Sequence, residues 1–157
     1  MTKRITVTLN KETRSLAVEP SDILLDVLRE TLGAKSPKIG CERGDCGACT
    51  VLLDGKTVRS CLILAIEVDG HEITTLEGLC QSGLTPVQQS LLKHNSFQCG
   101  FCAPGMVLSA TELLGKNPSP SKDEVKEAIS GNLCRCTGYE PVIDAIVAVG
   151  KKAGNHV

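Results

Sequence analysis

The stretch CERGDCGAC, residues 41–49, carries three thiols in one short segment, and Cys61 supplies a fourth further along the chain. Glycine stands directly before this stretch at Gly40 and recurs within it at Gly44 and Gly47. Because glycine adopts positive φ angles and has no side chain, such a loop can curl tightly and bring its N–H groups close to a bound anion. The stretch therefore predicts a small domain organised around a group held by four thiolates.

The overall composition favours metal binding as the use of these thiols. The 157 residues carry a net charge of −1, which gives no reason to expect a nucleic acid or an anionic membrane as partner. No apolar run approaches the roughly 18 residues that span a bilayer, and the N-terminal segment MTKRITVTLN shows no export signal. We therefore expect a cytoplasmic protein, in which thiols stay reduced, so that nine cysteines indicate metal sites rather than disulfides.

The spacing of the first thiol group indicates the kind of metal site. The pattern C-x4-C-x2-C, closed by a distant fourth cysteine, is the plant-type ferredoxin spacing for a 2Fe–2S cluster. A structural zinc site is the alternative, but zinc ribbons favour two C-x2-C knuckles, and only one pair here has that spacing. We therefore predict a 2Fe–2S cluster with four cysteine ligands: Cys41, Cys46, Cys49 and Cys61.

The sequence around this group predicts a small α+β domain covering about residues 1–76. Apolar and polar residues alternate over residues 5–9, which is the period of a β-strand. A second strand follows, and then Ser21 is placed to cap a helix with apolar residues at helical spacing. Asp54-Gly55 is a strong hairpin signal between two further strands, and a last strand is expected near Ile73.

The C-terminal half, residues 77–157, changes to helical periodicity and predicts four short helices packed as a bundle. Two of them start with capping boxes, TPVQ at 85–88 and SKDE at 121–124. The other two are expected to begin near Pro104 and Pro141, because proline is favoured in the first turn of a helix. The fold class is therefore α+β, with an all-α second half.

The remaining paired thiols form a second group, in which each pair precedes a predicted helix. Residues 99–102 read CGFC and lie ahead of Pro104, while residues 134–136 read CRC and lie ahead of Pro141. Two helix N-termini would then point to the same place, where their free N–H groups favour an anionic cluster. A Rieske centre is rejected because it needs two histidine ligands, and no histidine adjoins a cysteine pair. From spacing alone, zinc stays open as an alternative at this second group.

Three motifs together resemble the iron–sulfur subunit of the molybdenum hydroxylases. They are GCERGDCGACTV at 40–51, QCGFCAPGM at 98–106 and GNLCRCTGY at 131–139. This family includes xanthine dehydrogenase, aldehyde oxidoreductase, carbon monoxide dehydrogenase and 4-hydroxybenzoyl-CoA reductase. The likeness runs from Ile5 to about Val149. It implies that the second group holds another 2Fe–2S cluster, with four ligands: Cys99, Cys102, Cys134 and Cys136.

The resemblance also implies a fold and a layout. The fold would be a plant-type ferredoxin-like (β-grasp) domain, residues 1–76, followed by an all-α four-helix-bundle cluster domain, residues 77–157. The second cluster would lie nearest the molybdenum–pterin cofactor of a large subunit, and the first would face the FAD of a medium subunit. Gln98 matches the family glutamine that hydrogen-bonds the pterin, and Cys136 matches the ligand closest to that cofactor.

The function implied by the family is electron transfer, with no catalytic residue in this chain. Two clusters in series would pass single electrons between the molybdenum–pterin site and FAD, within a hetero-oligomer expected to be a dimer of heterotrimers. The alternatives are the same relay run in reverse, as in an aryl-CoA reductase, and a free-standing two-cluster ferredoxin. A zinc-stabilised interaction module is a further alternative, which two paramagnetic signals after partial reduction would exclude. The sequence does not identify the substrate of the complex.

Overall fold

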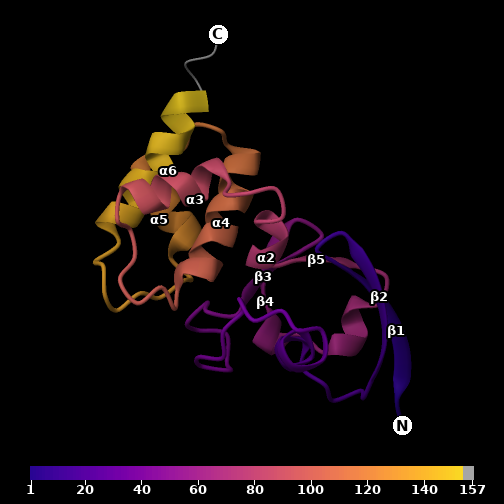
Figure 1. Cartoon of the computed structure of the whole chain (residues 1–157). Coiled ribbons are helices and arrows are strands. Elements are labelled where there is room, and N and C mark those ends of the chain that lie inside the picture. The colour runs from indigo at the N-terminus through magenta and orange to yellow at the C-terminus, as the bar shows by residue number, and fades with distance from the viewer. Residues whose placement is uncertain (154–157) are drawn as a thin grey trace.

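The chain forms a sheet-containing part and a helical part, which lie side by side in the computed structural model (Figure 1). The structure describes residues 1–153. The sequence predicts a frayed end from Lys151 to Val157; for Lys151 and Lys152 this is wrong, because helix α6 (Glu140–Ala153) includes both, and the remainder lies outside the described residues. The N-terminal half of the sequence builds the sheet part and the C-terminal half builds the helical part. The predicted α+β class is therefore confirmed.

A five-stranded mixed sheet forms the N-terminal part. Its strands are β1 (Lys3–Leu9), β2 (Glu12–Val18), β3 (Thr50–Leu53), β4 (Lys56–Arg59) and β5 (Glu72–Thr74). The strand order is β2-β1-β5-β3-β4, with β5 parallel to β1 and antiparallel to β3. The last strand thus lies at the centre and ties the two hairpins, β1–β2 and β3–β4, into one sheet.

Both hairpins turn through two residues with positive φ. Asn10 and Lys11, with φ of 51° and 71°, join β1 to β2, and Asp54 and Gly55, with φ of 48° and 79°, join β3 to β4. Two consecutive positive φ angles are typical of the type I′ turn, whose twist matches that of the flanking strands. The hairpin predicted from Asp54-Gly55 is confirmed, and it returns the chain to the loop that carries the first thiols.

A short helical segment packs on the sheet, and it begins later than predicted. It consists of α1 (Leu24–Asp26) and a π-helical turn, η1 (Val27–Thr31). Its N-cap is Ile23 rather than Ser21, so the capping role predicted for Ser21 is wrong. Ile23 has extended geometry because it forms an antiparallel bridge with Leu64, and the Leu24 N–H donates to the carbonyl of Ile63 (2.8 Å). Strand-like pairing therefore delays the start of the helix.

In the described residues the helical part contains four helices, as predicted. They are α3 (Pro86–Lys93), α4 (Ala103–Lys116), α5 (Lys122–Ile129) and α6 (Glu140–Ala153). The one-turn helix α2 (Leu76–Leu79) connects β5 to them, whereas the 3-10 turns η2 (Ser60–Leu62) and η3 (Ala65–Val68) lie between β4 and β5 in the sheet part. Both predicted capping boxes are present, Thr85 with Gln88 at α3 and Ser121 with Glu124 at α5. The helices enclose their own apolar core, with Met106 fully buried in it.

Helix α4 joins the two parts by packing against β3 and β4. Its Glu112 accepts a hydrogen bond from the N–H of Thr57 in β4 (Oε2–N 2.8 Å). Burial would raise the pKa of Glu112, but hydrogen bonds from Lys116 and Thr57 lower it to about 2. Each part has a separate buried apolar cluster. Separate cores do not mark the residue at which one domain ends, so the predicted boundary after residue 76 stays a prediction.

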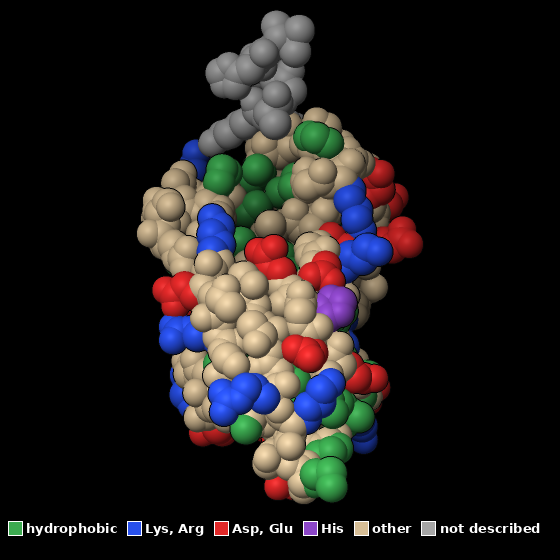
Figure 2. Space-filling view, turned by 90° about the vertical axis from the view of Figure 1, so that its right-hand side faces the viewer, with side chains coloured by type: hydrophobic (Ala, Val, Ile, Leu, Met, Phe, Trp, Pro, Cys, Tyr) green, Lys and Arg blue, Asp and Glu red, His purple; other side chains and the backbone are tan. Residues whose placement is uncertain are grey.

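The surface carries charges of both signs. On the face shown in Figure 2, Lys and Arg side chains are interspersed with Asp and Glu side chains, without a broad field of either sign on that face. This mixture agrees with the net charge of −1. Among the described residues, no helix combines the length and the apolar character needed to cross a membrane.

Candidate metal centres

The first thiol group gathers where the β3–β4 hairpin returns to the 41–49 loop. Cys49 immediately precedes β3, and Cys61 lies in η2, directly after β4. The hairpin register pairs Thr50 with Arg59, so the two cysteines flank its open end. Their thiols lie side by side, and both residues are buried. The hairpin therefore fixes one half of the group.

Cys41 and Cys46 form the other half, on the more exposed side of the loop. The Cys46 N–H donates to Cys41 Sγ (3.3 Å). Hydrogen bonds from the N–H groups of Arg43 and Cys46 lower the pKa of the Cys41 thiol to about 6. Gly44, at φ 89°, directs its own N–H toward Cys61. The loop thus surrounds its sulfurs with N–H donors, which favour the thiolate form.

Burial has the opposite effect on Cys61. It raises the pKa of the Cys61 thiol to about 11, and the neighbouring Cys49 and Cys41 add to the rise. Thiols buried together resist ionisation, because each thiolate would lie unpaired in a poorly solvated place beside another. A bound cation removes that penalty. The first group is therefore a donor set that becomes fully ionised only around positive charge.

The second thiol group comes from two loops, each leading into a helix. Cys99 and Cys102 precede α4, and Cys134 and Cys136 precede α6. The Sγ atoms of Cys99 and Cys136 lie 3.7 Å apart, while Cys102 lies beside Cys134 at the edge of the helical core. The structure thus brings together the four cysteines that the sequence expected to share a site. Their loops lie at the end of the helical part that adjoins the 41–49 loop (Figure 1).

This second group has an inner pair and an outer pair. Cys99 and Cys136 are exposed, whereas Cys102 is buried and Cys134 half-buried. Burial raises the pKa of the Cys102 thiol to about 12. Burial acts in the same direction on Cys134, but hydrogen bonds from the Thr137 hydroxyl and from nearby N–H groups lower its pKa overall. The outer pair therefore reaches the surface while the inner pair is shielded from water.

Two side chains hold the loops of the second group. Tyr139, at φ 69°, accepts a hydrogen bond from the N–H of Cys134 (Oη–N 2.8 Å). A left-handed non-glycine residue costs on the order of 1–3 kcal/mol, and it persists only where its surroundings fix it. Gln98 is exposed, and its Nε2 donates to the carbonyl of Cys136 (2.9 Å). Gln98 thus ties the two cysteine loops together, and its predicted contact with a pterin stays a prediction.

The thiols of each group converge in pairs rather than around one point. Within residues 1–153, no three His, Cys, Asp or Glu side chains are placed to hold a single metal ion. A 2Fe–2S cluster makes a different demand, because each of its two irons takes two thiolates. The pairs are Cys41 with Cys46, Cys49 with Cys61, Cys99 with Cys136, and Cys102 with Cys134. The donor sets therefore fit two-iron clusters better than tetrahedral zinc.

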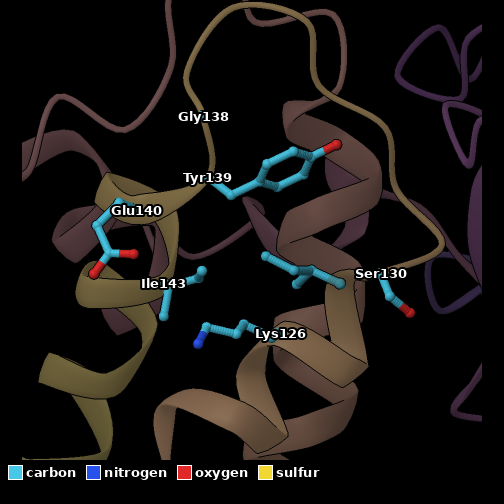
Figure 3. A pocket seen from close by; sticks show the side chains of 7 residues that line it. Lys126, Ser130, Gly138, Tyr139, Glu140 and Ile143 are labelled. Atoms are coloured by element: carbon cyan, nitrogen blue, oxygen red, sulfur yellow. The ribbon is translucent and has the colours of Figure 1, made fainter.

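A pocket of about 350 Å³ lies between α5 and α6. Figure 3 shows the ring of Tyr139 at one end of it, with Lys126 at the opposite end and Glu140 to one side. No thiol lines this pocket. It adjoins the second group through Gly138 and Tyr139, whose hydroxyl accepts from the Cys134 N–H, so it is not itself a candidate metal centre.

The sequence did not indicate the role of Asn132, which lies between the two groups. Asn132 is 1% exposed, and its side chain forms hydrogen bonds with Ser109, Gly47 and Thr50. Its place in the motif at 131–139 was the available signal, but a motif does not name a partner elsewhere in the chain. The structure supplies that partner, which is the loop of the first group.

Known proteins match both parts of the chain. The model of the 2Fe-2S iron-sulfur cluster binding domain matches residues 7–85, and that of the 2Fe-2S binding domain matches residues 75–147. The nicotine 6-hydroxylase small subunit of Paenarthrobacter nicotinovorans is 49% identical over 151 residues, which cover 96% of this chain and 92% of that protein.

Solved structures agree with these matches. A chain of quinoline 2-oxidoreductase from Pseudomonas putida 86 superposes with a TM-score of 0.92 at 50% identity, covering 99% of this chain and 98% of that chain. The aldehyde oxidoreductase from Desulfovibrio gigas gives a TM-score of 0.91 at 42% identity, covering 97% of this chain but 17% of that chain. In that enzyme the matching region is one part of a much longer polypeptide.

Fold and matched domains together define a protein that carries two 2Fe–2S clusters, one in the sheet part and one in the helical part. Within this class, the chain belongs to the iron–sulfur small subunits of the molybdenum hydroxylase family. It is an electron-transfer subunit of a dehydrogenase of this type. The predicted ferredoxin-like first half and helical second half are thereby confirmed.

Proposed function

We propose that this subunit relays single electrons between a molybdenum–pterin site in a large subunit and FAD in a medium subunit. The observation that carries the proposal is the adjacency of two four-thiol groups. A hydrogen bond from the Leu133 N–H to the Cys46 carbonyl (2.9 Å) joins the loop of one group to the loop of the other. When bound there, 2Fe–2S clusters supply one-electron chemistry, so a two-electron site can release its electrons one at a time.

The proposed ligands are the eight paired thiols. The first cluster would be held by Cys41, Cys46, Cys49 and Cys61, and the second by Cys99, Cys102, Cys134 and Cys136. The chain's own residues bind, orient and shield. N–H donors around Cys41 stabilise negative charge on sulfur, and burial of the inner thiols excludes water. Hydrogen bonds to sulfur and exposure set the potentials of such clusters.

The second cluster would lie nearest the molybdenum–pterin cofactor, and the first would face FAD. Exposure of the outer pair supports this order, because a partner's cofactor can approach Cys99 and Cys136 without disturbing the helical core. Gln98 is exposed beside them and donates to the Cys136 carbonyl, so it is suitably placed for a hydrogen bond to a docked pterin.

The proposed assembly is a cytoplasmic hetero-oligomer, a dimer of heterotrimers, in which this chain contributes domains 1–76 and 77–157. The relative from Paenarthrobacter nicotinovorans is named a small subunit, which supports larger partners. The Desulfovibrio gigas enzyme supports the same idea, because the matching region there shares one chain with a much larger remainder.

The proposal can be tested with Cys136→Ser in the intact complex. We expect turnover with an electron acceptor to fall strongly, while substrate still binds and reduces the large subunit in the absence of acceptor. Cys80→Ser is the matched control, since Cys80 belongs to neither group and its sulfur accepts from Gln88 Nε2 (2.9 Å), a role that serine can retain. Unchanged turnover in Cys136→Ser, with both clusters verified by spectroscopy, would contradict the proposal.

A further inference from the structure

A single buried amide connects the loops of the two thiol groups. Asn132 is 1% exposed and lies two residues before Cys134. Its Nδ2 donates to the carbonyl of Gly47 (3.0 Å) and to Thr50 Oγ1 (3.1 Å), and its Oδ1 accepts from Ser109 Oγ (2.8 Å). Gly47 directly follows Cys46. One side chain therefore spans from the backbone beside a first-group thiol to the backbone beside a second-group thiol.

The backbone around this amide leaves no room for side chains. A Cβ atom on Gly47 would lie 2.1 Å from the carbonyl oxygen of Gly131, and a Cβ on Gly105 would lie 2.6 Å from Asn132 Nδ2. A Cβ on Gly131 would lie 2.2 Å from a guanidinium nitrogen of Arg59. Gly47 and Gly105 thus let the two loops and α4 approach backbone to backbone, while Gly131 leaves space for the Arg59 side chain. Such a close approach tolerates little relative movement of the loops.

Further hydrogen bonds run alongside the amide. The Leu133 N–H donates to the Cys46 carbonyl (2.9 Å), and Arg59 donates to both the Gly131 carbonyl (2.7 Å) and Thr50 Oγ1 (2.8 Å). Asn132 lies at the centre of this set. Because a buried polar group that loses its partner is costly, the amide holds the loops in one register rather than in several.

We propose that Asn132 is a positioning residue for the electron step between the two clusters. It touches no sulfur, and it acts by holding the Leu133 N–H against the Cys46 carbonyl, which fixes the separation and relative orientation of the two thiol groups. The step moves one electron, so one cluster is oxidised and the other reduced, and no bond to an atom of this chain forms or breaks. Because electron transfer slows steeply with separation, loosening this contact slows the step. The inference rests on the proposed function, since it takes both thiol groups as cluster ligands.

Asn132→Ala in the assembled complex tests the proposal, with Asn117→Ala as the matched control. Asn117 is an asparagine of the same half whose Nδ2 bonds instead to Glu124 in the α4–α5 region. The readouts are the iron content, the paramagnetic signal of each cluster, the magnetic coupling between the two reduced clusters, and the rate of electron transfer between them after rapid reduction. We expect Asn132→Ala to keep both signals, weaken or alter the coupling, and slow the transfer by about tenfold or more. Asn117→Ala should match the unmodified protein in all four readouts.

A purely structural role would change stability or cluster content without changing coupling and rate at full cluster content. Unchanged coupling and rate in Asn132→Ala, with both clusters present, would overturn the proposal. If Asn132→Ala fails to assemble its clusters, Ser109→Ala decides, because it removes only the donor to Asn132 Oδ1. It should then alter coupling and rate in the same direction with a smaller amplitude, and no change would overturn the proposal. Failure of the proposed function is distinct, because it would appear as unchanged turnover in Cys136→Ser with both clusters verified, whereas the present test compares electron transfer between the clusters in Asn132→Ala and in the unmodified protein.

Discussion

The two thiol groups, which we propose as ligands of the same kind of cluster, are held by differently built parts of the fold. In the sheet part, three of the four thiols lie on the 41–49 loop, and a hairpin supplies the fourth, so most of the site is specified locally. In the helical part, two loops far apart in sequence meet only because the helices pack. The first site therefore depends on loop geometry and the second on tertiary structure, which predicts different consequences when either is disturbed.

Removing one buried thiol from each group is expected to have the largest effect. Cys49→Ser and Cys102→Ser should each lose one cluster, so that iron falls from about four to about two ions per chain. Because cluster binding contributes to folding where the ligands join separate segments, Cys102→Ser should lower the thermal midpoint more than Cys49→Ser. Iron analysis, spectroscopy and thermal unfolding check this. Equal lowering of the thermal midpoint by the two variants would show that the two sites do not differ in this way.

The same contrast explains how much of the molecule could be predicted from its sequence. The first group could be predicted because its cysteine spacing and its glycines lie in one segment of sequence. The β3–β4 hairpin could be predicted because Asp54-Gly55 favours a tight turn by itself. The start of α1 was mispredicted, because the bridge from Ile23 to Leu64 is a long-range pairing that overrides a capping residue at Ser21. The grouping of the second set of thiols followed from two cysteine pairs that each precede a predicted helix, but its identification as a 2Fe–2S site needed a family resemblance, since C-x2-C and C-x-C spacings leave zinc open.

The contact between the two parts was even harder to predict from the sequence. Asn132, Arg59 and Gly105 form part of it, yet each is separated by many residues from the partners it meets. An asparagine before a cysteine motif, or a glycine within a helix, has many possible causes. Only the folded arrangement shows that these residues serve one junction, because long-range packing decides which side chains meet.

Gly47→Ala is expected to have the next largest effect, because it disturbs the contact through which the two sites meet. Gly47 has φ 71°, and a Cβ there would overlap the Gly131 carbonyl oxygen at 2.1 Å. We expect a loss of about 3–5 kcal/mol in the free energy of unfolding, which combines backbone strain with a forced separation of the loops. Gly55→Ala is the control, since Gly55 has φ 79° with nothing within 4 Å of the added Cβ, and it should cost about 1 kcal/mol.

Denaturant unfolding of both variants measures the difference. A Gly47→Ala loss no larger than that of Gly55→Ala would show that the two loops do not meet as described. A large loss of unfolding free energy together with weakening of both cluster signals would show that both cluster sites depend on this one contact between the loops.

The hydrogen bond from the Thr57 N–H to Glu112 is a weaker contact between the two parts, and its contribution to stability should depend on pH. Its pKa is lowered from 4.5 to about 2 in the folded protein, so its carboxylate stabilises the fold above the unfolded-state pKa, and this contribution is lost as pH falls from about 4.5 toward 2. At pH 7, Glu112→Gln should lower the free energy of unfolding by about 1–3 kcal/mol. Glu127→Gln, at an exposed position on α5, is the control.

Amide hydrogen exchange at several pH values from 7 down to about 2.5 follows this link, because the Glu112 contribution is lost between about pH 4.5 and 2. The difference between Glu112→Gln and the unmodified protein should shrink as the solution is acidified, and it should be concentrated in β4 and α4, where the Thr57 N–H meets the carboxylate. A difference that stays constant with pH would mean that the contact is maintained by shape rather than by charge.

The smallest effect is expected within the support of the second site, at Lys122. Its ammonium group lies 2.7 Å from carboxylate oxygens of both Glu140 and Asp144, and so joins α5 to α6, the helices on either side of the Cys134 loop. Hydrogen bonds to Asp144 and then Glu140 raise the pKa of Lys122, but all three side chains are 44–61% exposed. Exposed ion pairs contribute little, so Lys122→Met should shift the thermal midpoint by no more than about 2–4 °C and leave the second cluster signal unchanged.

Lys126→Met is the matched control, because within the described part of the chain Lys126 forms its ion pair with Asp123 inside α5 and none with α6. Thermal unfolding of both variants at low and high salt distinguishes the Lys122 contribution from that of Lys126, since screening should remove the small shift in thermal midpoint caused by Lys122→Met. If Lys122→Met instead displaced the second cluster, the helix pair would be positioned by its surface charges. We expect buried apolar residues between α5 and α6, such as Val125 and Ile146, to position the two helices. The second cluster signal should therefore change when the helical core or the contact at Asn132 is altered, and hardly change when surface charges are removed.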